Sequence, residues 1–440
     1  MTITIQSNTD TILELPGLAG TLGPGKTTIL PNVTEDLVRA IDLGLLLVPS
    51  GAEAPEGLPP VVFDHQYPHV LPVSADRAYY VRVLRSPSGF HDGTGLRDFV
   101  AYYGDGDGMS CAFSDDGISW DNEKEITGIV ANGYHVVCAL EASDRLRILY
   151  WNPDIPNQPY AMAGLRTAVC NPQADASVFT EDAACTGNLV TEGTEAVWNR
   201  GHYGPSFLWY NPKPTSIPGK PFTWRYAMFF VASTGGNDSL GLGYSDDGLS
   251  WQLYGDTPVI SGLIDPQEWE GANGYISACH VERLADGRWW MLYSGSTAGN
   301  AGIGYAWSWD RIHWTKASFN PVFQAGNGPF LERCYTPSLV INADGSLLLY
   351  RSARDEDSYR TFVSRLRAPS LSWQDLLESD HLGQGLAPRN TIHRGTGSEA
   401  ERDAAIPNPA LGDEWFNTDL SGGGKWEKYT GTEWKKGSSG

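Results

Sequence analysis

The sequence predicts an all-β protein built around a five-bladed β-propeller over residues 59–385, with a small α+β module before it and a small β module after it. Three observations predict this fold. A turn motif recurs along the chain, a second motif opens an apolar segment in each repeat, and the 440 residues include 50 Gly and 28 Pro. Many short strands joined by tight turns need both of these residue types.

The recurring turn has the pattern Ser-Asp-Asp-Gly-x-Ser-Trp. FSDDGISW ends at Trp120, YSDDGLSW at Trp251 and the variant WSWDRIHW at Trp314, and a worn copy, APSLSW, ends at Trp373. The first interval is about twice the later ones, so we expect a lost copy near residues 178–186, within VFTEDAAC. The Asp can bond turn amides, the Gly accepts a positive φ and the Trp can pack between blades, which predicts a structural role.

The second motif is a small turn followed by His or Ser and an apolar strand. These His and Ser residues are His69, His135, Ser206, His280 and Ser338. A second β-rich segment follows each copy, and Asp-Gly turns join two of the pairs. With the SDDG turn and a fourth short segment, each repeat has four antiparallel strands. We expect the five His and Ser residues near the starts of the innermost strands.

The two ends differ from the middle. Residues 1–58 hold β-type segments and one predicted helix, TEDLVRAIDLG, which Thr34 can cap and Gly44 can end, and we expect an attachment module. Within it, GTLGPGKT matches the phosphate-binding loop pattern, but the β-branched TTILP follows where a helix is needed, so we do not expect nucleotide binding. Residues 386–440 predict two aromatic strands around a glycine-rich turn.

Composition excludes several classes of partner. The net charge of −21 argues against nucleic acid, which needs clustered Lys and Arg. No apolar run approaches the ~18 residues of a membrane helix, so no membrane insertion is expected, and the first residues lack the pattern of a secretory signal. The six cysteines have no CxxC spacing, which argues against a zinc ribbon. We expect buried thiols, with Cys170 and Cys185 as one pair that could form a disulfide.

The terminal segments resemble modules of bacteriophage tail and fibre proteins. SEAERDAAIPNPALGDEWFNTD and WEKYTGTEW carry this resemblance near the C-terminus, and LGPGKTTILPNVTEDLVRAIDLGLLLVPSG carries it near the N-terminus. The resemblance implies a virion tail protein, made in the host cytoplasm, with other tail proteins as partners. By analogy with phage fibres, it also implies a homo-oligomer, namely a trimer.

The propeller resembles the five-bladed glycoside hydrolases, which include arabinanases, β-xylosidases, invertases and levansucrases. The SDDGxSW turns and the strand openings YPHV, YGPSF and YTPSL carry this resemblance. In that family, carboxylates at the starts of the innermost strands act at an axial channel, one on water or carbon and one as the acid. Residue by residue, these acids fall on Tyr67, Gly204 and Ala278. The resemblance therefore implies a fold that has lost this chemistry.

Other residues could still supply chemistry at the channel. Loop acids precede the predicted innermost strands one, four and five, and they could catalyse glycoside hydrolysis or simply be solvated: Asp64, Glu270 and Glu332. The histidines at equivalent predicted positions would point at one axis: His69, His135 and His280. Such a ring could hold a calcium or transition-metal ion, or bond channel waters. No other cofactor is expected.

The leading hypothesis is a phage tail fibre or receptor-binding protein whose propeller binds host-surface polysaccharide without catalysis. Aromatic faces stack on sugar C–H groups and polar groups fix the hydroxyls. We expect the following residues to bind the ligand: Tyr67, His69, Tyr134, His135, Tyr203, Trp209, Tyr275, His280 and Tyr335. Two alternatives stay open, a virion depolymerase that cleaves this polysaccharide and a purely structural baseplate or decoration protein.

Overall fold

The structure is a computed structural model of the chain. It describes most of residues 78–367 and isolated strands before and after them. Within residues 78–367 it leaves out mainly 105–107, 130–133, 152–164, 189–200, 217–222, 234–237, 271–273, 284–287, 325–332 and 342–346. The chain separates into two compact units, Met1–Leu386 and Ala387–Gly440. Within the described part, no helix is long and apolar enough to cross a membrane.

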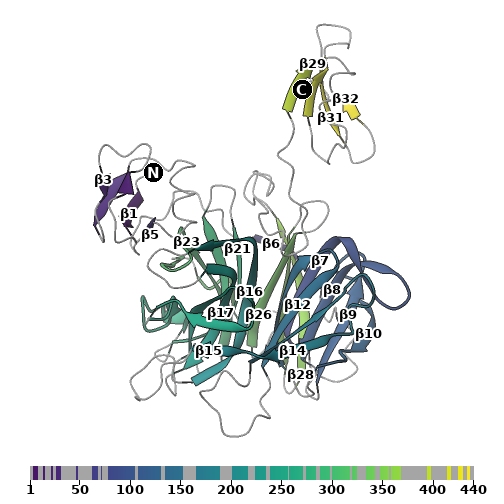
Figure 1. The fold of residues 1–440 in the computed structure, drawn as a ribbon, viewed down its shortest axis with the longest axis horizontal. Coiled ribbons are helices and arrows are strands. Elements are labelled where there is room, and N and C mark those ends of the chain that lie inside the picture. Colours follow the sequence, from purple (N-terminus) through teal and green to yellow (C-terminus); the bar gives the residue numbers. More distant parts are fainter. Residues whose placement is uncertain are drawn as a thin grey trace. The chain divides into compact units, whose positions relative to one another are not determined.

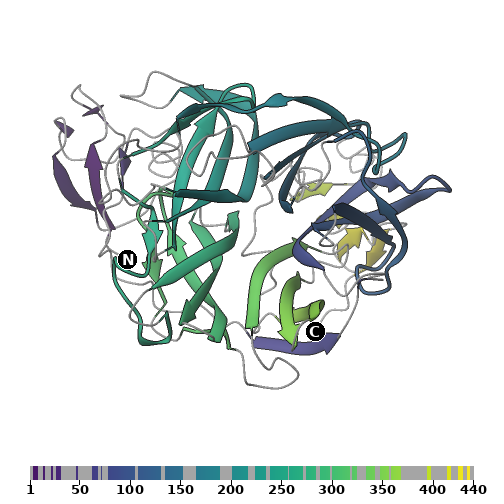
Figure 2. The ribbon, with the colours of Figure 1, turned by 90° about the horizontal axis from the view of Figure 1, so that it is seen from below.

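Five antiparallel blades form the middle of the chain (Figures 1 and 2), which confirms the predicted propeller. Blade one has β7 (Tyr79–His91), β8 (Leu96–Gly104), β9 (Met109–Ser114) and β10 (Asp121–Glu125). Blade two has β11 (Tyr134–Ala142), β12 (Arg145–Trp151), β13 (Leu165–Cys170) and β14 (Thr180–Ala184).

The third blade has β16 (Gly201–Ser216), β17 (Thr223–Ser233), β18 (Asp238–Ser245) and β19 (Ser250–Leu253), flanked by β15 (Thr186–Asn188) and β20 (Ile260–Ser261). Blade four has β21 (Tyr275–Arg283), β22 (Trp289–Thr297), β23 (Asn300–Ser308), β24 (Thr315–Lys316) and β25 (Phe323–Gln324). Blade five has β26 (Arg333–Ile341), β27 (Leu347–Asp355), β28 (Ser358–Arg367) and β6 (Val62–Tyr67).

The first strand of each blade lies innermost. The strands β7, β11, β16, β21 and β26 contact one another in a closed ring, and Figure 2 shows the blades arranged around one centre. Strands within a blade alternate in direction. The five innermost strands therefore all start at one end of the propeller, which we call the axial mouth. The SDDG turns, which join third to fourth strands, lie at the opposite end.

The ring is closed by a strand that precedes the first blade in sequence. β6 pairs antiparallel with β28, with Tyr67 opposite Val363, so residues 62–67 form the outermost strand of blade five. The expectation that Tyr67 and His69 open the innermost strand of blade one is wrong, because β7 occupies that place. His69 itself lies outside the described residues.

The innermost strands share a bulge near their starts. In blades one, two and five, a residue in the bulge has a positive φ: 52° at Tyr80, 57° at His135 and 53° at Thr336. Gly204 holds the comparable place in blade three, with a φ of 127°. Non-glycine residues rarely adopt this conformation, so its recurrence marks a built feature of the strands. Positions after the bulge correspond from blade to blade.

The SDDG turn is held by its own side chains, as predicted. In blade one, Asp116 Oδ1 accepts the N–H groups of Ile118 and Ser119 at 2.7 and 2.6 Å. Gly117 has a φ of 73°, and Trp120 Nε1 donates to the Gly117 carbonyl at 3.1 Å. The same bonds recur around Asp247 and Asp310 in blades three and four. The motif therefore has a structural role in all three copies.

Each of these turns also touches the preceding blade. Tyr350 of blade five donates its hydroxyl to the Gly117 carbonyl at 2.6 Å. In the third copy Arg311 takes the glycine position, at a φ of 69°. Its guanidinium lies 4.6 to 5.1 Å from the ring centroids of three tryptophans, Trp209, Trp224 and Trp289. The turns thus link neighbouring blades by hydrogen bonds and by cation–π contacts.

The degenerate turn of blade two lies earlier than the sequence suggested. Most of VFTEDAAC forms the fourth strand β14, and the turn is NPQADAS at residues 171–177. Asp175 Oδ1 there accepts the N–H of Ser177 at 2.9 Å, which preserves the aspartate of the motif. The Gly and Trp of the motif are missing from this turn, so the motif cannot be recognised in its sequence. The worn copy that ends at Trp373 lies outside the described residues.

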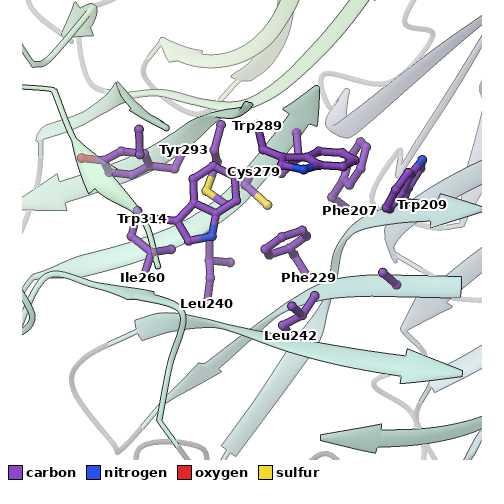
Figure 3. Close-up of a cluster of buried hydrophobic side chains, with 14 of the residues drawn as sticks. Phe207, Trp209, Phe229, Leu240, Leu242, Ile260, Cys279, Trp289, Tyr293 and Trp314 are labelled. Atoms are coloured by element: carbon purple, nitrogen blue, oxygen red, sulfur yellow. The ribbon is translucent and has the colours of Figure 1, made fainter. Parts of the chain in front are cut away.

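Apolar side chains fill the space between blades. Figure 3 shows the cluster between blades three and four, where Phe207, Phe229, Trp289 and Trp314 pack together. All six cysteines are buried free thiols. The two that could have paired belong to separate clusters, Cys170 among blades one and two and Cys185 between blades two and three, so no disulfide joins them.

Short sheets are present near both ends of the chain. Near the N-terminus, β1 (Ile3–Ser7) pairs with β4 (Thr27–Leu30) and β5 (Leu46–Leu47) in one sheet, and β2 (Leu13–Glu14) pairs with β3 (Thr21–Leu22) in another. Near the C-terminus, four strands form one sheet: β29 (Arg394–Gly397), β30 (Glu414–Asn417), β31 (Lys425–Tyr429) and β32 (Trp434–Lys436). The strand β4 directly follows GPGK, where a phosphate-binding loop requires a helix. The predicted helix after Pro31 lies outside the described residues.

Candidate ligand-binding site

One arginine crosses the axis of the propeller. Arg82 lies on β7, and only 3% of it is exposed. Its Nη1 donates to the Pro337 carbonyl of blade five at 2.6 Å and to the adjacent Val81 carbonyl at 3.3 Å. Its Nη2 donates to the Cys279 carbonyl of blade four at 3.2 Å and to the Ser206 carbonyl of blade three. A single guanidinium therefore joins the innermost strands of four blades.

The partners of Arg82 are all backbone carbonyls. Buried charges are normally paired with an opposite charge. Among the described residues, however, no carboxylate pairs with Arg82, and its Nε has no hydrogen-bond partner. Burial lowers the pKa of Arg82, but an arginine stays protonated under any ordinary condition. The axis thus holds a positive charge that is solvated by the protein backbone.

A stacked aromatic pair lies at the axial mouth. The rings of Tyr80 in blade one and His135 in blade two are 3.7 Å apart between centroids and 23° from parallel. Gly204 of blade three lies against the imidazole, since a Cβ there would come within 2.8 Å of His135 Nδ1. The position also has a φ of 127°. An aspartate at 204 would therefore collide with His135.

The place that corresponds to the glycosidase acid on β21 is also closed. Ala278 is fully buried, and Cys279 follows it. The N–H of Cys279 donates to Ser206 Oγ at 2.7 Å, and the Ser206 hydroxyl lies 3.4 Å from Cys279 Sγ. Burial raises the pKa of the Cys279 thiol to about 12, so it is not a thiolate nucleophile at neutral pH. Ser338 of blade five similarly accepts the N–H of Val83 at 3.1 Å.

Several predicted binding residues do gather at the axial mouth. His135 lies in the stacked pair, Tyr275 is partly exposed at the start of β21, and Tyr335 lies at the start of β26. Tyr134 and Tyr203 belong to the starts of β11 and β16 by their backbone. These five residues come from four blades, so the innermost strands bring together backbone positions that are far apart in sequence.

Two predicted binding residues lie elsewhere. Trp209 packs in the core between blades three and four, with the Trp289 ring centroid 4.6 Å away. His280 is buried beside Phe207, and its Nε2 lies 3.0 Å from Glu282 Oε1. Both side chains pack among residues of blades three and four, so their predicted binding roles are corrected.

The predicted ring of histidines is also corrected. His135 is in the bulge of β11, whereas His280 directly follows Cys279, which corresponds to Arg82, so the two occupy different positions in their strands. Within the parts that the structure describes, no three His, Cys, Asp or Glu side chains come close enough to hold a metal ion.

Of the three candidate catalytic acids, Glu270 is the one whose side chain the structure describes. It is fully buried, and its Oε2 accepts Lys316 Nζ at 2.7 Å while its Oε1 accepts the Tyr293 hydroxyl at 2.8 Å. These bonds occupy both oxygens, so Glu270 stabilises the loop before β21 and is not free to reach a substrate. Asp64 lies in β6, on the outer edge of blade five. Glu332 lies outside the described residues.

The sequence patterns do not single out Tyr80 or Arg82. Both lie in AYYVRVL, which follows YPHV, and the patterns predict YPHV as the opening of the innermost strand and AYYVRVL as the second strand. A signal was present, since a charged residue in the middle of an apolar run points to a special environment. The true start of blade one, at Tyr79 and Tyr80, carries no acid.

Searches with the sequence match no protein-family model and no curated protein. The structure is similar to a thermostable family-43 glycoside hydrolase, with 15% identity, 70% of this chain and 92% of that chain covered, and a TM-score of 0.46. It is similar to an endo-arabinase from Bacteroides thetaiotaomicron, with 14% identity, coverages of 69% and 98%, and a TM-score of 0.45. An endo-1,4-beta-xylanase from the same organism has 14% identity, coverages of 68% and 97%, and a TM-score of 0.44. The assignment of the propeller fold rests on the strand pairing described above.

Proposed function

We propose that the propeller binds a glycan at its axial mouth and does not cleave it. The observation that carries this proposal is Arg82, which fills the axis where glycoside hydrolysis needs two facing carboxylates, about 5 to 10 Å apart. The described residues at the starts of the five innermost strands include no acid. The described residues at the mouth thus offer no acid and base pair for glycoside hydrolysis.

The side chains at the mouth suit a saccharide. Tyr275 and Ser277 are partly exposed on β21, and the stacked rings of Tyr80 and His135 are buried, with 5% and 8% exposure. Aromatic rings can stack on the C–H faces of a sugar, while hydroxyls and an imidazole can bond its hydroxyl groups. This combination supports weak, specific recognition of a sugar chain at a fixed scaffold.

We further propose that the chain is a receptor-binding protein of a bacteriophage tail. Support comes from the terminal segments, whose amino-acid sequences resemble those of phage tail and fibre modules. In this role the propeller would bind host-surface polysaccharide, and the terminal modules would join it to other tail proteins, as a trimer by analogy with fibres. Adsorption of virions in the presence of excess free propeller tests this part, because a receptor-binding protein should compete.

Two measurements on the isolated protein test the binding function. A glycan array of bacterial capsule and lipopolysaccharide saccharides should show saturable binding, which His135→Ala weakens at least about tenfold. The matched control is Arg145→Gln, an exposed position at the opposite end of the propeller. The same saccharides should yield no new reducing ends. Appearance of reducing ends would support a depolymerase instead, and absence of all binding would support a structural role.

A further inference from the structure

We infer that the axial mouth selects glycans that carry a carboxylate, with the guanidinium of Arg82 as the opposite charge. This inference rests on the proposed glycan-binding function and names the class of ligand. It starts from the charges at the mouth. The described starts of the five innermost strands carry the full positive charge of Arg82 and no negative one.

The carbonyl groups around Arg82 do not cancel this charge. Their dipoles solvate the guanidinium, as water would, but the sum of a unit charge and four neutral groups is still one unit. In a buried setting the effective dielectric constant is far below that of water, so the charge acts over a longer distance. An anion at the mouth is the partner that the buried guanidinium lacks within the described residues.

A second buried guanidinium lies near the start of β26. Arg351 on β27 is fully buried, and it lies next to Cys334 at the start of β26. Its Nη1 donates to Ser364 Oγ at 2.5 Å. The described loop before β21 carries the exposed acids Asp265 and Glu268 and the buried Glu270, and Glu270 is paired with Lys316 at 2.7 Å. The paired Glu270 therefore does not offset the charge of Arg82.

The acidity of the chain as a whole does not oppose this inference. The net charge of −21 is spread over 440 residues. Exposed charges are screened within about 8 to 10 Å at physiological salt, whereas buried charges are screened much less. A ligand at the mouth therefore responds mainly to the groups on the axis.

The carboxylate would lie above Arg82 and not on it. Arg82 is buried, and Tyr80 and His135 lie nearer to the start of their strands. Hydroxyl groups at the mouth, such as that of Ser277, can hold the carboxylate oxygens, and Arg82 then acts through space. Such an arrangement predicts a preference that depends on charge and salt, with no requirement for a direct bond to the guanidinium.

The test compares saccharides that differ in one group. Oligosaccharides of galacturonate, glucuronate and N-acetylneuraminate are titrated alongside twins whose carboxyl groups have been reduced to alcohols. We expect at least one acid to bind about tenfold or more tightly than its twin at 50 mM NaCl, and the ratio to shrink at 500 mM NaCl. Mannose 6-phosphate serves as a phosphate-bearing comparison, and it should bind more weakly than the best carboxylate.

The outcomes separate this inference from the function beneath it. Equal binding of acids and their twins, or binding of neutral array saccharides alone, would overturn the charge preference and leave glycan binding intact. Binding of no saccharide, in this panel or on the array, would overturn the proposed function and the inference with it. A stronger response to mannose 6-phosphate than to every carboxylate would overturn the choice of carboxylate.

Variants at the axis give a second reading. Arg82→Lys keeps the charge and should keep the preference for acids, whereas Arg82→Met keeps the length, removes the charge and should bring the ratio close to one. Arg145→Gln removes an exposed charge at the other end and should leave the ratio unchanged. Thermal melts check that each variant is folded. If the Arg82 variants do not fold, the comparison of acids with their reduced twins on the wild-type protein still decides whether the mouth prefers a carboxylate.

Discussion

Arg82 of blade one donates through Nη1 to the carbonyl oxygen of Pro337 of blade five at 2.6 Å, a bond between residues 255 positions apart. It joins the first and last innermost strands of the ring. The same two blades are also connected at the outer edge, because β6 pairs with β28 of blade five and the chain then continues into blade one. The propeller is therefore closed twice, by a strand outside and by an arginine at the axis.

The first prediction concerns this axial closure. Arg82→Met removes the inter-blade hydrogen bonds and leaves buried carbonyls without donors. Because hydrogen bonds to charged groups are stronger than neutral ones and unsatisfied buried groups are costly, we expect the free energy of unfolding to fall by about 3–5 kcal/mol. Urea unfolding followed by tryptophan fluorescence measures this. The control Arg145→Gln should change it by less than about 0.5–1 kcal/mol, and an equal effect of both variants would argue against a special role for Arg82.

The second prediction concerns the glycine behind His135. Gly204→Ala places a Cβ within 2.8 Å of His135 Nδ1, at a φ of 127° that side chains rarely adopt. We expect a loss of about 2–4 kcal/mol in unfolding free energy and weaker ligand binding, since the Tyr80–His135 stack must shift. Gly255→Ala is the matched control, because nothing lies within 4 Å of its added Cβ. A neutral Gly204→Ala would show that the mouth is not packed as described.

The third prediction separates the two aspartates of one SDDG turn. Asp247 Oδ1 accepts the N–H groups of Leu249 and Ser250 at 2.8 and 2.7 Å. Both aspartates are exposed, but Asp246 makes no such bonds to the described turn amides. Asp247→Ala should cost about 1–2 kcal/mol, as the loss of a capping aspartate does elsewhere. Asp246→Ala should cost less than about 0.5 kcal/mol. Thermal or urea unfolding of the two variants decides whether the motif is structural.

The stability difference between wild type and Asp247→Ala should also depend on pH. Burial alone would raise the pKa of Asp247, but the backbone hydrogen bonds from Ser250 and Leu249 outweigh it and hold the pKa below its usual value. A lowered pKa stabilises the fold above the pKa of the unfolded state, and this contribution is lost as the pH falls through the folded value. The difference between wild type and Asp247→Ala should therefore shrink below about pH 4. A difference that stays constant at low pH would contradict this.

The fourth prediction concerns a buried carboxyl group, Glu282, whose pKa is shifted upward and not downward as in Asp247. Burial raises the pKa of Glu282 from 4.5 to about 8, and His280 is its hydrogen-bonded neighbour at 3.0 Å. A raised pKa means that Glu282 stays protonated to a higher pH in the folded state than in the unfolded state. Stability should then fall between about pH 4.5 and 8, by up to a few kcal/mol.

Glu282→Gln isolates this group. The variant cannot ionise, so it should gain stability relative to wild type as the pH rises through that window, which thermal unfolding at pH 5 and pH 8 measures. Glu268→Gln, at an exposed position, should follow wild type at both pH values. A Glu282→Gln variant whose difference from wild type does not change with pH would show that Glu282 is already ionised in the fold.

The sequence predicts the number of blades and the chemistry of the turns because each SDDG motif is local. Asp116 and Gly117 make their turn contacts with residues close to them in sequence, so the sequence motif alone predicts the turn. Strand order around the ring is not local. β6 resembles the opening of a blade, and only its pairing with β28 shows that it closes the last one.

The site was harder to predict for the same reason. Arg82 finds its partners 124 to 255 residues away, on carbonyl groups that every residue possesses. No side-chain pattern marks such partners. Trp209 likewise looks like a sugar-binding aromatic in sequence, and its burial against Trp289 depends on how blades three and four pack. Predictions from residue type alone therefore located the mouth through His135 and Tyr275 but not its central charge.

The central claim, binding without cleavage, is tested most directly by one chromatography experiment. The protein is incubated with the polysaccharide form of its best array saccharide, and the mixture is separated by size with light-scattering detection. We expect the polysaccharide to co-elute with the protein and to keep its original chain length after prolonged incubation. A shortened polysaccharide would contradict the claim, because the propeller would then be a glycoside hydrolase, and a polysaccharide that elutes apart from the protein would contradict it as well.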